Sequence, residues 1–333
     1  MVEGFNGATL RLARIFHGLT LEQVADQVGK TRQYLHQIET GQKTPTPDLV
    51  DALAAIVAVK PRYFFAGPRS PIAEEDFHFR GLFTSRMPAK QLAMAKAEIF
   101  VRLVEALERD VKLPELRIPS ISDAHTADDV ERAAETCRRE WQIGLGPVSN
   151  MIRLAENVGA LVTTFHAVSK EVDALSVFID RPIIVRNDAK ESVCRMRFDI
   201  GHELGHAVLH RGAVTGDRLT EGQAHRFAGA LLVPRAMMIK LFPRGRGSRL
   251  DWRGISEFKL TWKISKQALL YRAHQLDLIS DSQFRTGIIT LKRGGEATQE
   301  REDHAIPAEA PELLKRSVAV MKEKKGLTLT DIA

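Results

Sequence analysis

The sequence predicts a mainly helical α+β protein with an all-α N-terminal domain, a following domain that holds a small three-stranded sheet, and a helical C-terminal region. Three observations lead to this prediction. Residues 9–65 form short amphipathic runs separated by glycines, residues 160–185 contain three short β-like runs, and most of the remaining chain has helical periodicity. With 333 residues, the chain is long enough for two or three domains, each with its own core.

Residues 9–65 carry the signals that start and stop short helices. Three glycines follow helical runs where a left-handed residue would end the helix: Gly18, Gly29 and Gly41. Three threonines stand where N-caps are expected: Thr20, Thr31 and Thr46. These signals predict several short helices in sequence.

The spacing around Gly29 predicts a helix-turn-helix. Counted from Leu21 as the first position, the small residue Ala25 is fifth and Gly29 is ninth, while Leu35 and Ile38 can lock the second helix down. The polar residues left on the outer face of the second helix are our candidate DNA contacts: Thr31, Arg32, Gln33, His36 and Gln37. A helical bundle used for protein docking is the alternative interpretation.

The stretch "QYLHQIETGQKTPTPDLVDALAAIV" resembles the Xre/Cro-type repressor family, over residues 9–65. The resemblance implies a five-helix domain that binds a double-stranded DNA operator, usually as a dimer. The base sequence of the operator does not follow from it.

The rest of the chain alternates predicted helices with three predicted strands. Helices are expected at 89–112, 127–141, 192–210, 220–232, within 251–279 and at 311–324, and strands at 160–165, 174–179 and 182–185. Residues 292–311 are so polar that we expect them to be poorly ordered.

The stretch "FDIGHELGHAVLH" places His202, Glu203 and His206 on one predicted helix. Two histidines four residues apart project from one helix face and can share a metal ion, and Glu203 beside them can accept a proton from a water molecule. His210 cannot join them, because eight residues of helix separate it from His202 by about 12 Å along the axis. We therefore expect His210 to be a packing or cap residue.

A catalytic zinc site needs a third protein ligand. Glu221, on the next predicted helix, is the first candidate, with His225 four residues on as the residue that orients a ligand. The alternative is that His225 itself binds the metal and Glu221 supports it. Asp217 is a weaker third option.

The stretches "RFDIGHELGHAVLHRG" and "EGQAHRFAGALLVP" together resemble the ImmA/IrrE family of metallopeptidases, over roughly 140–280. The resemblance implies a zincin-like fold, with His202, His206 and Glu221 as ligands of Zn²⁺ and Glu203 as general base. Many relatives have "ExEAN" where this chain has Gln223 and His225, so the fine tuning of the site differs. A structural or inactive zinc site is the alternative, but Glu203 would be of no use there.

Composition and charge limit the class of protein, its cellular compartment and its binding partners. Hydrophobic content of 44% and charged content of 27% are those of a soluble globular protein, and no apolar run approaches the roughly 20 residues that span a bilayer. The stretch "MVEGFNGATLRLAR" lacks the apolar core of a signal peptide, so we expect no export signal. Two cysteines, Cys137 and Cys194, make no disulfide framework, so we expect a cytoplasmic protein whose thiols only pack. The net charge is +6, and residues 240–274 hold nine Lys or Arg against two Asp or Glu. This basic stretch could meet DNA or an acidic substrate, or be a solvated face.

These patterns predict five segments. They are a helix-turn-helix domain at 1–67, a helical connector at 68–125, a peptidase core at 126–245, its helical C-terminal part at 246–291, and a polar linker with a tail helix at 292–333. The last residues, "GLTLTDIA", are similar to "GLTLEQVA" of residues 18–25, which we interpret as a truncated or vestigial second helix-turn-helix. An ordinary capped amphipathic turn is the alternative.

Together the two halves predict a DNA-binding regulator with a zinc-dependent, gluzincin-like endopeptidase domain. The resemblance implies cleavage of few proteins, often a repressor, and we expect this in a stress or mobile-element response. A regulator without proteolysis, such as an antitoxin whose zinc domain senses a ligand or partner, is the alternative. A general peptidase that dimerises through its first domain is a third interpretation.

Overall fold

The computed structural model describes residues 4–65, 72, 77–80, 87–165, 174–178, 181–187, 192–213, 215–245, 247 and 249–326. Contacts divide the chain into two compact units, one of residues 1–77, 81–112 and 317–333, the other of residues 78–80 and 113–316. The predicted turn at 67–71 and the C-terminal "LTLTDIA" lie outside the described residues. Within the described parts, no helix is long and apolar enough to cross a membrane. The predicted domain boundaries stay predictions.

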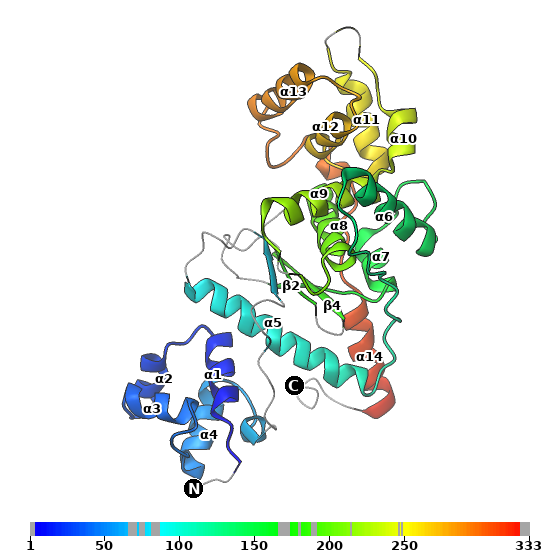
Figure 1. Ribbon diagram of the computed structural model, residues 1–333. Helices are drawn as coiled ribbons and strands as arrows, with labels where there is room; N and C mark the ends of the chain where they lie inside the picture. Colours follow the sequence, from blue (N-terminus) through cyan, green and yellow to red (C-terminus); the bar gives the residue numbers. More distant parts are fainter. Residues whose placement is uncertain are drawn as a thin grey trace. The chain divides into compact units, whose positions relative to one another are not determined.

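The first unit opens with the short helices that the sequence predicts (Figure 1). They are α1 (Gly7–Phe16), α2 (Leu21–Gln27), α3 (Arg32–Glu39), α4 (Pro47–Ile56) and the 3₁₀ turn η1 (Pro61–Phe65). Gly18, Gly29 and Gly41 all have positive φ, as predicted for residues that end helices. The hydroxyl groups of Thr20 and Thr31 accept hydrogen bonds from Gln23 N and Tyr34 N.

Thr46 departs from this pattern. It is the N-cap residue of α4, but its side chain makes no capping hydrogen bond. Pro47 begins α4 instead, where its fixed φ suits the first helical position.

The core of the first unit is formed by the apolar positions of the helix-turn-helix pattern. Val24, Ala25, Leu35 and Ile38 are buried, while Val28 is partly buried against them. A buried ion pair joins α1 to α3, because Arg14 Nε and Nη2 donate to the two carboxylate oxygens of Glu39 at 2.6 and 2.9 Å. The long predicted helix is α5 (Met87–Glu108), which packs against α1.

The second unit contains most of the remaining elements. Its helices are α6 (Ala127–Glu140), α7 (Met151–Asn157), α8 (Val193–Leu209), α9 (Arg218–Leu232), α10 (Arg235–Leu241), α11 (Trp252–Trp262), α12 (Lys266–Gln275) and α13 (Asp281–Arg293), with the 3₁₀ turn η4 (Asp303–Ala305) and the start of α14 (Leu313–Lys325). The helix α10 was not among the helices that the sequence predicts.

The sheet of the second unit is mixed. The three predicted strands are present as β2 (Leu161–Phe165), β3 (Ala174–Phe178) and β4 (Pro182–Asn187), with β2 parallel and β3 antiparallel to β4. A fourth strand that was not predicted, β1 (Phe77–Arg80), extends the order to β1-β3-β4-β2. The sheet contacts α8 through β3 and β4, so it supports the helix that carries the histidines (Figure 1).

Residues 292–311 contradict the expectation of poor order. They hold η4 and several buried carboxylates, and these carboxylates neutralise cations of the second unit. Lys259 Nζ donates to Glu300 at 2.5 Å and also to Asp303, and Arg197 pairs with Glu309. The acidic side chains of residues 292–311 thus bind buried cations, and composition alone does not reveal this pairing.

The basic stretch at 240–274 is therefore not a uniform solvated face. Lys259, Lys266 and Arg272 are all buried. Lys266 pairs with Glu296 and Glu302, and Arg272 binds the Glu131 carboxylate through both Nη atoms. Three of the nine Lys or Arg residues of this stretch are thus buried and paired with carboxylates inside the unit.

Candidate metal centre

The helices α8 and α9 pack closely and run antiparallel. A Cβ atom added to Gly201 would lie 3.4 Å from Ala228 Cα, and one added to Gly205 would lie 3.2 Å from Ala224 Cα. The later residue of α8 therefore faces the earlier residue of α9, as in an antiparallel pair of helices. The Gly205 contact is tighter than side chains usually accept, so glycine allows this approach. The approach brings residues of α9 next to the His-Glu-x-x-His helix.

Three of the predicted metal ligands lie together. The distance between the Nε2 atoms of His202 and His206 is 3.0 Å. The Glu221 carboxylate completes the group, with 3.3 Å from His202 Nε2 to Oε2 and 3.3 Å from His206 Nε2 to Oε1. Both histidine side chains are almost fully buried, at 1% and 2% exposure, whereas the Glu221 side chain is 31% exposed. The group is therefore open to solvent on the side of Glu221.

These distances fit a small tetrahedral cation. Ligand atoms placed about 2.1 Å from one central ion at tetrahedral angles lie about 3.4 Å apart. Two imidazole nitrogens and a carboxylate oxygen are also the donor types that zinc takes in catalytic sites. The donor set of His202, His206 and Glu221 therefore fits a zinc ion in both chemistry and spacing.

Electrostatics keep the Glu221 carboxylate ionised. Burial raises the pKa of this carboxyl group, but the imidazoles of His202 and His206 outweigh burial and lower the pKa well below its ordinary value. An ionised carboxylate beside two buried imidazoles is an anionic ligand ready for a cation.

His225 lies at the edge of the same group. One nitrogen of His225 falls within 4.8 Å of ligand atoms of His202 and Glu221, and the His202 and His225 rings are 4.5 Å apart between centroids. The Nδ1 atom is 2.8 Å from the main-chain oxygen of Glu221, which can only accept, so Nδ1 carries a proton and donates. His225 is thus tied to the backbone of Glu221, and it is within reach of a metal as well.

The two other candidates have different tasks. His210 is the C-cap residue of α8, its Nδ1 is 3.0 Å from His206 Nδ1, and burial lowers its pKa. Asp217 is the N-cap of α9 and accepts from Leu219 N and Thr220 N. Neither places a ligand atom in the metal group found among the described residues.

Glu203 points toward the sheet. Its buried carboxylate accepts a hydrogen bond from the hydroxyl group of Ser176, on β3. Ser176 was not predicted as a site residue, because no sequence signal identifies it and only the packing of β3 on α8 brings the two residues together.

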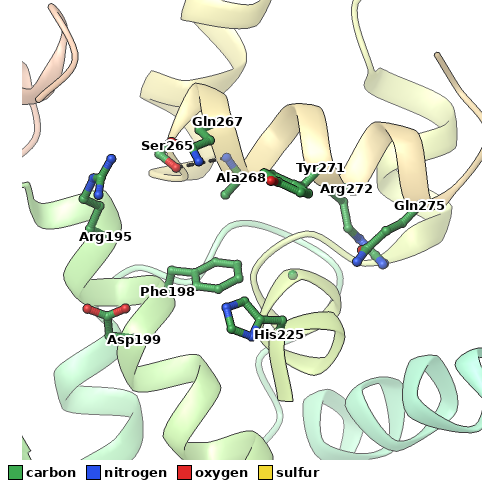
Figure 2. Close-up of a pocket in the computed structure, with 11 residues that line it drawn as sticks. Arg195, Phe198, Asp199, His225, Ser265, Gln267, Ala268, Tyr271, Arg272 and Gln275 are labelled. Atoms are coloured by element: carbon green, nitrogen blue, oxygen red, sulfur yellow. Dashed lines mark hydrogen bonds between the residues drawn. The ribbon is translucent and has the colours of Figure 1, made fainter. Parts of the chain in front are cut away.

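A pocket of about 370 Å³ is lined by residues of α8, α9 and α12, with His225 among them (Figure 2). Phe198 and Asp199 of α8 lie one helical turn before His202, and α12 closes the pocket with Ala268 and Tyr271. Figure 2 shows the rings of Phe198 and His225 on one side and Tyr271 on the other. The pocket is large enough for an amino-acid side chain or a small molecule.

The candidate DNA contacts lie on and before α3. Thr31, Arg32, Gln33 and His36 are exposed, and Gln37 is partly buried. Thr31 also caps α3, so its hydroxyl group already accepts the Tyr34 N–H at 3.2 Å. The face around Arg32 and Gln33 is therefore the open part of the predicted recognition surface.

The fold and the site together define a class of protein, one in which a helix-turn-helix domain and a peptidase-like metal domain share one chain. Family models agree with both halves. Residues 7–62 match a model described as a helix-turn-helix domain, and residues 155–274 match the Peptidase_M78 model, described as the IrrE N-terminal-like domain. The chain thus contains an N-terminal helix-turn-helix domain followed by an IrrE N-terminal-like domain, as the sequence motifs predict.

No curated protein matches this chain. The crystal structure of Bacillus thuringiensis PlcR in complex with the peptide PapR7 and DNA aligns with 88% of this chain and 81% of that chain, at 10% sequence identity. Its TM-score of 0.17 is too low to support an argument about fold or function.

Proposed function

We propose that this protein is a DNA-binding transcription regulator whose second unit is a zinc-dependent endopeptidase, and that it cleaves a repressor-type protein in a stress or mobile-element response. The carrying observation is the group formed by His202, His206 and Glu221, with separations of 3.0 to 3.3 Å, beside the buried Glu203. A structural zinc site usually takes four protein ligands and needs no acid beside them.

In this proposal, the zinc ligands are His202, His206 and Glu221. His225 supports Glu221 by donating a hydrogen bond from Nδ1 to the Glu221 main-chain oxygen. A bound zinc ion would supply Lewis-acid polarisation of the scissile carbonyl group. Glu203 accepts a proton from the attacking water and passes it to the leaving amine. Ser176 orients the Glu203 carboxylate for these transfers.

The pocket beside His225 is where we expect a side chain of the protein substrate to bind. It lies beside the metal group, since His225 lines the pocket and has a nitrogen within 4.8 Å of ligand atoms of His202 and Glu221. The rings of Phe198 and Tyr271 would contact an apolar or aromatic side chain next to the cleaved bond, and Arg195 and Asp199 would supply polar contacts at the same pocket.

The first unit is the DNA-binding part of the proposal. Arg32 and Gln33 present the side chains that suit guanine, adenine or phosphate, and Thr31, His36 and Gln37 flank them. A dimer on an operator and a cytoplasmic location complete the proposal, and the two buried free cysteines agree with a reducing compartment.

Zinc content is the deciding experiment. We expect about one zinc ion per purified wild-type chain and loss of that ion in Glu221→Ala, with Glu257→Ala, an exposed glutamate of α11, as the control. Retention of zinc in His225→Ala together with loss in His206→Ala would favour the proposed ligands, and the reverse would favour His225 as the ligand. Glu203→Gln should keep zinc and lose cleavage of the repressor.

A regulator without proteolysis predicts a different result. In that case Glu203→Gln would behave like the wild type in target regulation and in every cleavage assay. A chain that takes up no zinc after supplementation would also contradict the peptidase proposal.

A further inference from the structure

His206 makes close contacts with both of its ring nitrogens. Its Nε2 atom faces His202 Nε2 and Glu221, and its Nδ1 atom lies 3.0 Å from His210 Nδ1. Two nitrogens at 3.0 Å need one donor and one acceptor, so the hydrogen-bond partners of His210 decide which nitrogen of His206 keeps a proton.

The amide of Gln223 determines which nitrogen donates in the contact between His206 and His210. Its Nε2 atom donates to the main-chain oxygen of Ala124 at 2.8 Å. Because a carbonyl oxygen only accepts, the NH₂ group must face Ala124 and the Oε1 atom must face the other way. There, Oε1 lies 2.8 Å from His210 Nε2, so this nitrogen carries a proton and donates it to the amide oxygen.

The donor and acceptor roles of the ring nitrogens of His210 and His206 follow from this hydrogen bond. A neutral imidazole has one N–H and one lone pair, so His210 with a proton on Nε2 has its lone pair on Nδ1. His210 Nδ1 therefore accepts from His206 Nδ1–H. With its proton on Nδ1, the neutral His206 ring has its lone pair on Nε2, so Nε2 is the acceptor in the 3.0 Å contact with His202 Nε2 and points into the metal group.

We propose that Gln223 is a positioning residue that acts through His210 to hold His206 in the tautomer whose Nε2 lone pair faces the metal group. The inference deepens the proposed function, since it rests on His206 as a zinc ligand. It also gives Gln223 and His210 a joint task that the motif around Glu221 does not reveal. An acid at position 223 would place a carboxylate against the Ala124 oxygen with no proton between them, so the amide is the suitable group here.

The tautomer can be observed without any metal. In the metal-free full-length protein at pH 8.5, ¹⁵N spectra of labelled histidines should show His206 protonated at Nδ1 and His210 at Nε2. The His206 signals are identified by their loss in His206→Gln. If His206 carries its proton on Nε2 instead, the inference is wrong, whether or not the protein is a peptidase.

The second measurement is zinc affinity, by competition with a chromophoric chelator. Gln223→Met keeps the side-chain length and removes both hydrogen bonds, so we expect zinc binding to weaken by roughly 10- to 100-fold. The His210 and His206 ¹⁵N signals should also show mixed tautomers in this variant. The exposed Gln299→Met is the control and should match the wild type.

The outcomes separate the two proposals. Unchanged tautomers in Gln223→Met would overturn the role of Gln223. A wild-type chain with the expected tautomers that binds no zinc would keep this hydrogen-bond chain and contradict the proposed peptidase. Far-UV circular dichroism of Gln223→Met checks its folding. If that variant does not fold, a wild-type spectrum with the opposite tautomers still overturns the inference.

Discussion

Ser176 of β3 donates a hydrogen bond to the carboxylate of Glu203 on α8, and both residues are buried. The bond joins the sheet to the helix that carries the predicted general base. Replacing Ser176 with Ala would remove this hydrogen bond, so the orientation of the Glu203 carboxylate would be held less firmly.

We expect Ser176→Ala to bind zinc like the wild type and to cleave the repressor about 10-fold more slowly in kcat/KM, since orienting groups around metal sites contribute effects of this size. Ser256→Ala, which loses a bond to Glu302 outside the metal group, is the control. Equal cleavage rates for Ser176→Ala and the wild type would show that Ser176 does not orient Glu203.

The contact of α8 with α9 should tolerate a methyl group at one glycine and not at the other. At Gly205 a Cβ would lie 3.1 Å from the Phe227 ring and 3.2 Å from Ala224 Cα, whereas at Gly201 the nearest atoms are at 3.4 Å. We expect Gly205→Ala to lower the free energy of unfolding by about 1–3 kcal/mol and to weaken zinc binding, because α9 carries Glu221.

Gly201→Ala is the matched control for Gly205→Ala. It lies on the same helix in ordinary van der Waals contact, and alanine favours a helix by up to about 1 kcal/mol over glycine. Chemical denaturation and chelator competition measure both variants. Equal behaviour of the two would mean that the close approach at Gly205 does not position the ligands.

The predicted recognition face can be tested apart from the metal centre. We expect Arg32→Ala and Gln33→Ala each to weaken operator binding by roughly 10- to 100-fold, as for the loss of a base or phosphate contact, with zinc content unchanged. Footprinting and titration at fixed salt on the DNA upstream of its own gene provide the measurement. The control is the exposed Arg62→Ala, and an effect as large as that of Arg32→Ala would point to general charge rather than to α3.

The ordered segment at 292–311 should make the protein sensitive to acid. Burial raises the pKa of Asp303, but bonds from Lys259 and from Glu300 N lower it overall. A carboxyl group with a lowered pKa stabilises the fold above its unfolded pKa of about 3.9, and this stability is lost as the pH falls through the folded pKa. The contribution of Asp303 to thermal stability should therefore fade below about pH 4.

Asp303→Asn isolates this effect. At pH 7 it should lower the free energy of unfolding by about 3 kcal/mol, because the buried Lys259 loses one anionic partner. The difference in free energy of unfolding between this variant and the wild type should become smaller in acid. The exposed Asp123→Asn should follow the wild type at each pH. A difference in free energy of unfolding that does not depend on pH would contradict the ion-pair explanation.

The two cysteines should be inert in the folded protein. Burial raises the pKa of Cys137 and of Cys194 to about 12 each, so both thiols are neutral and covered near pH 8. A thiol-reactive chromophore at pH 8 should label neither residue in the native chain and both in guanidinium chloride. Rapid labelling of the native chain would contradict their role as packing residues.

The helix-turn-helix half could be predicted from the sequence because its signals are local. Glycines with positive φ, threonine caps and the spacing of Ala25, Leu35 and Ile38 act within a few residues of where they stand. The positions of the strands and of α8 and α9 followed from periodicity for the same reason.

The sequence by itself determined which residues could form the metal group, since His202 and His206 must share one face of a helix. The tertiary structure decided how that face is completed. Only the packing of α8 against α9 and β3 sets the distances to Glu221, the bond from Ser176, and the contact of Gln223 with His210. Likewise, residues 292–311 are ordered because their carboxylates bind buried cations far away in the chain, and such long-range pairing leaves no local pattern to read.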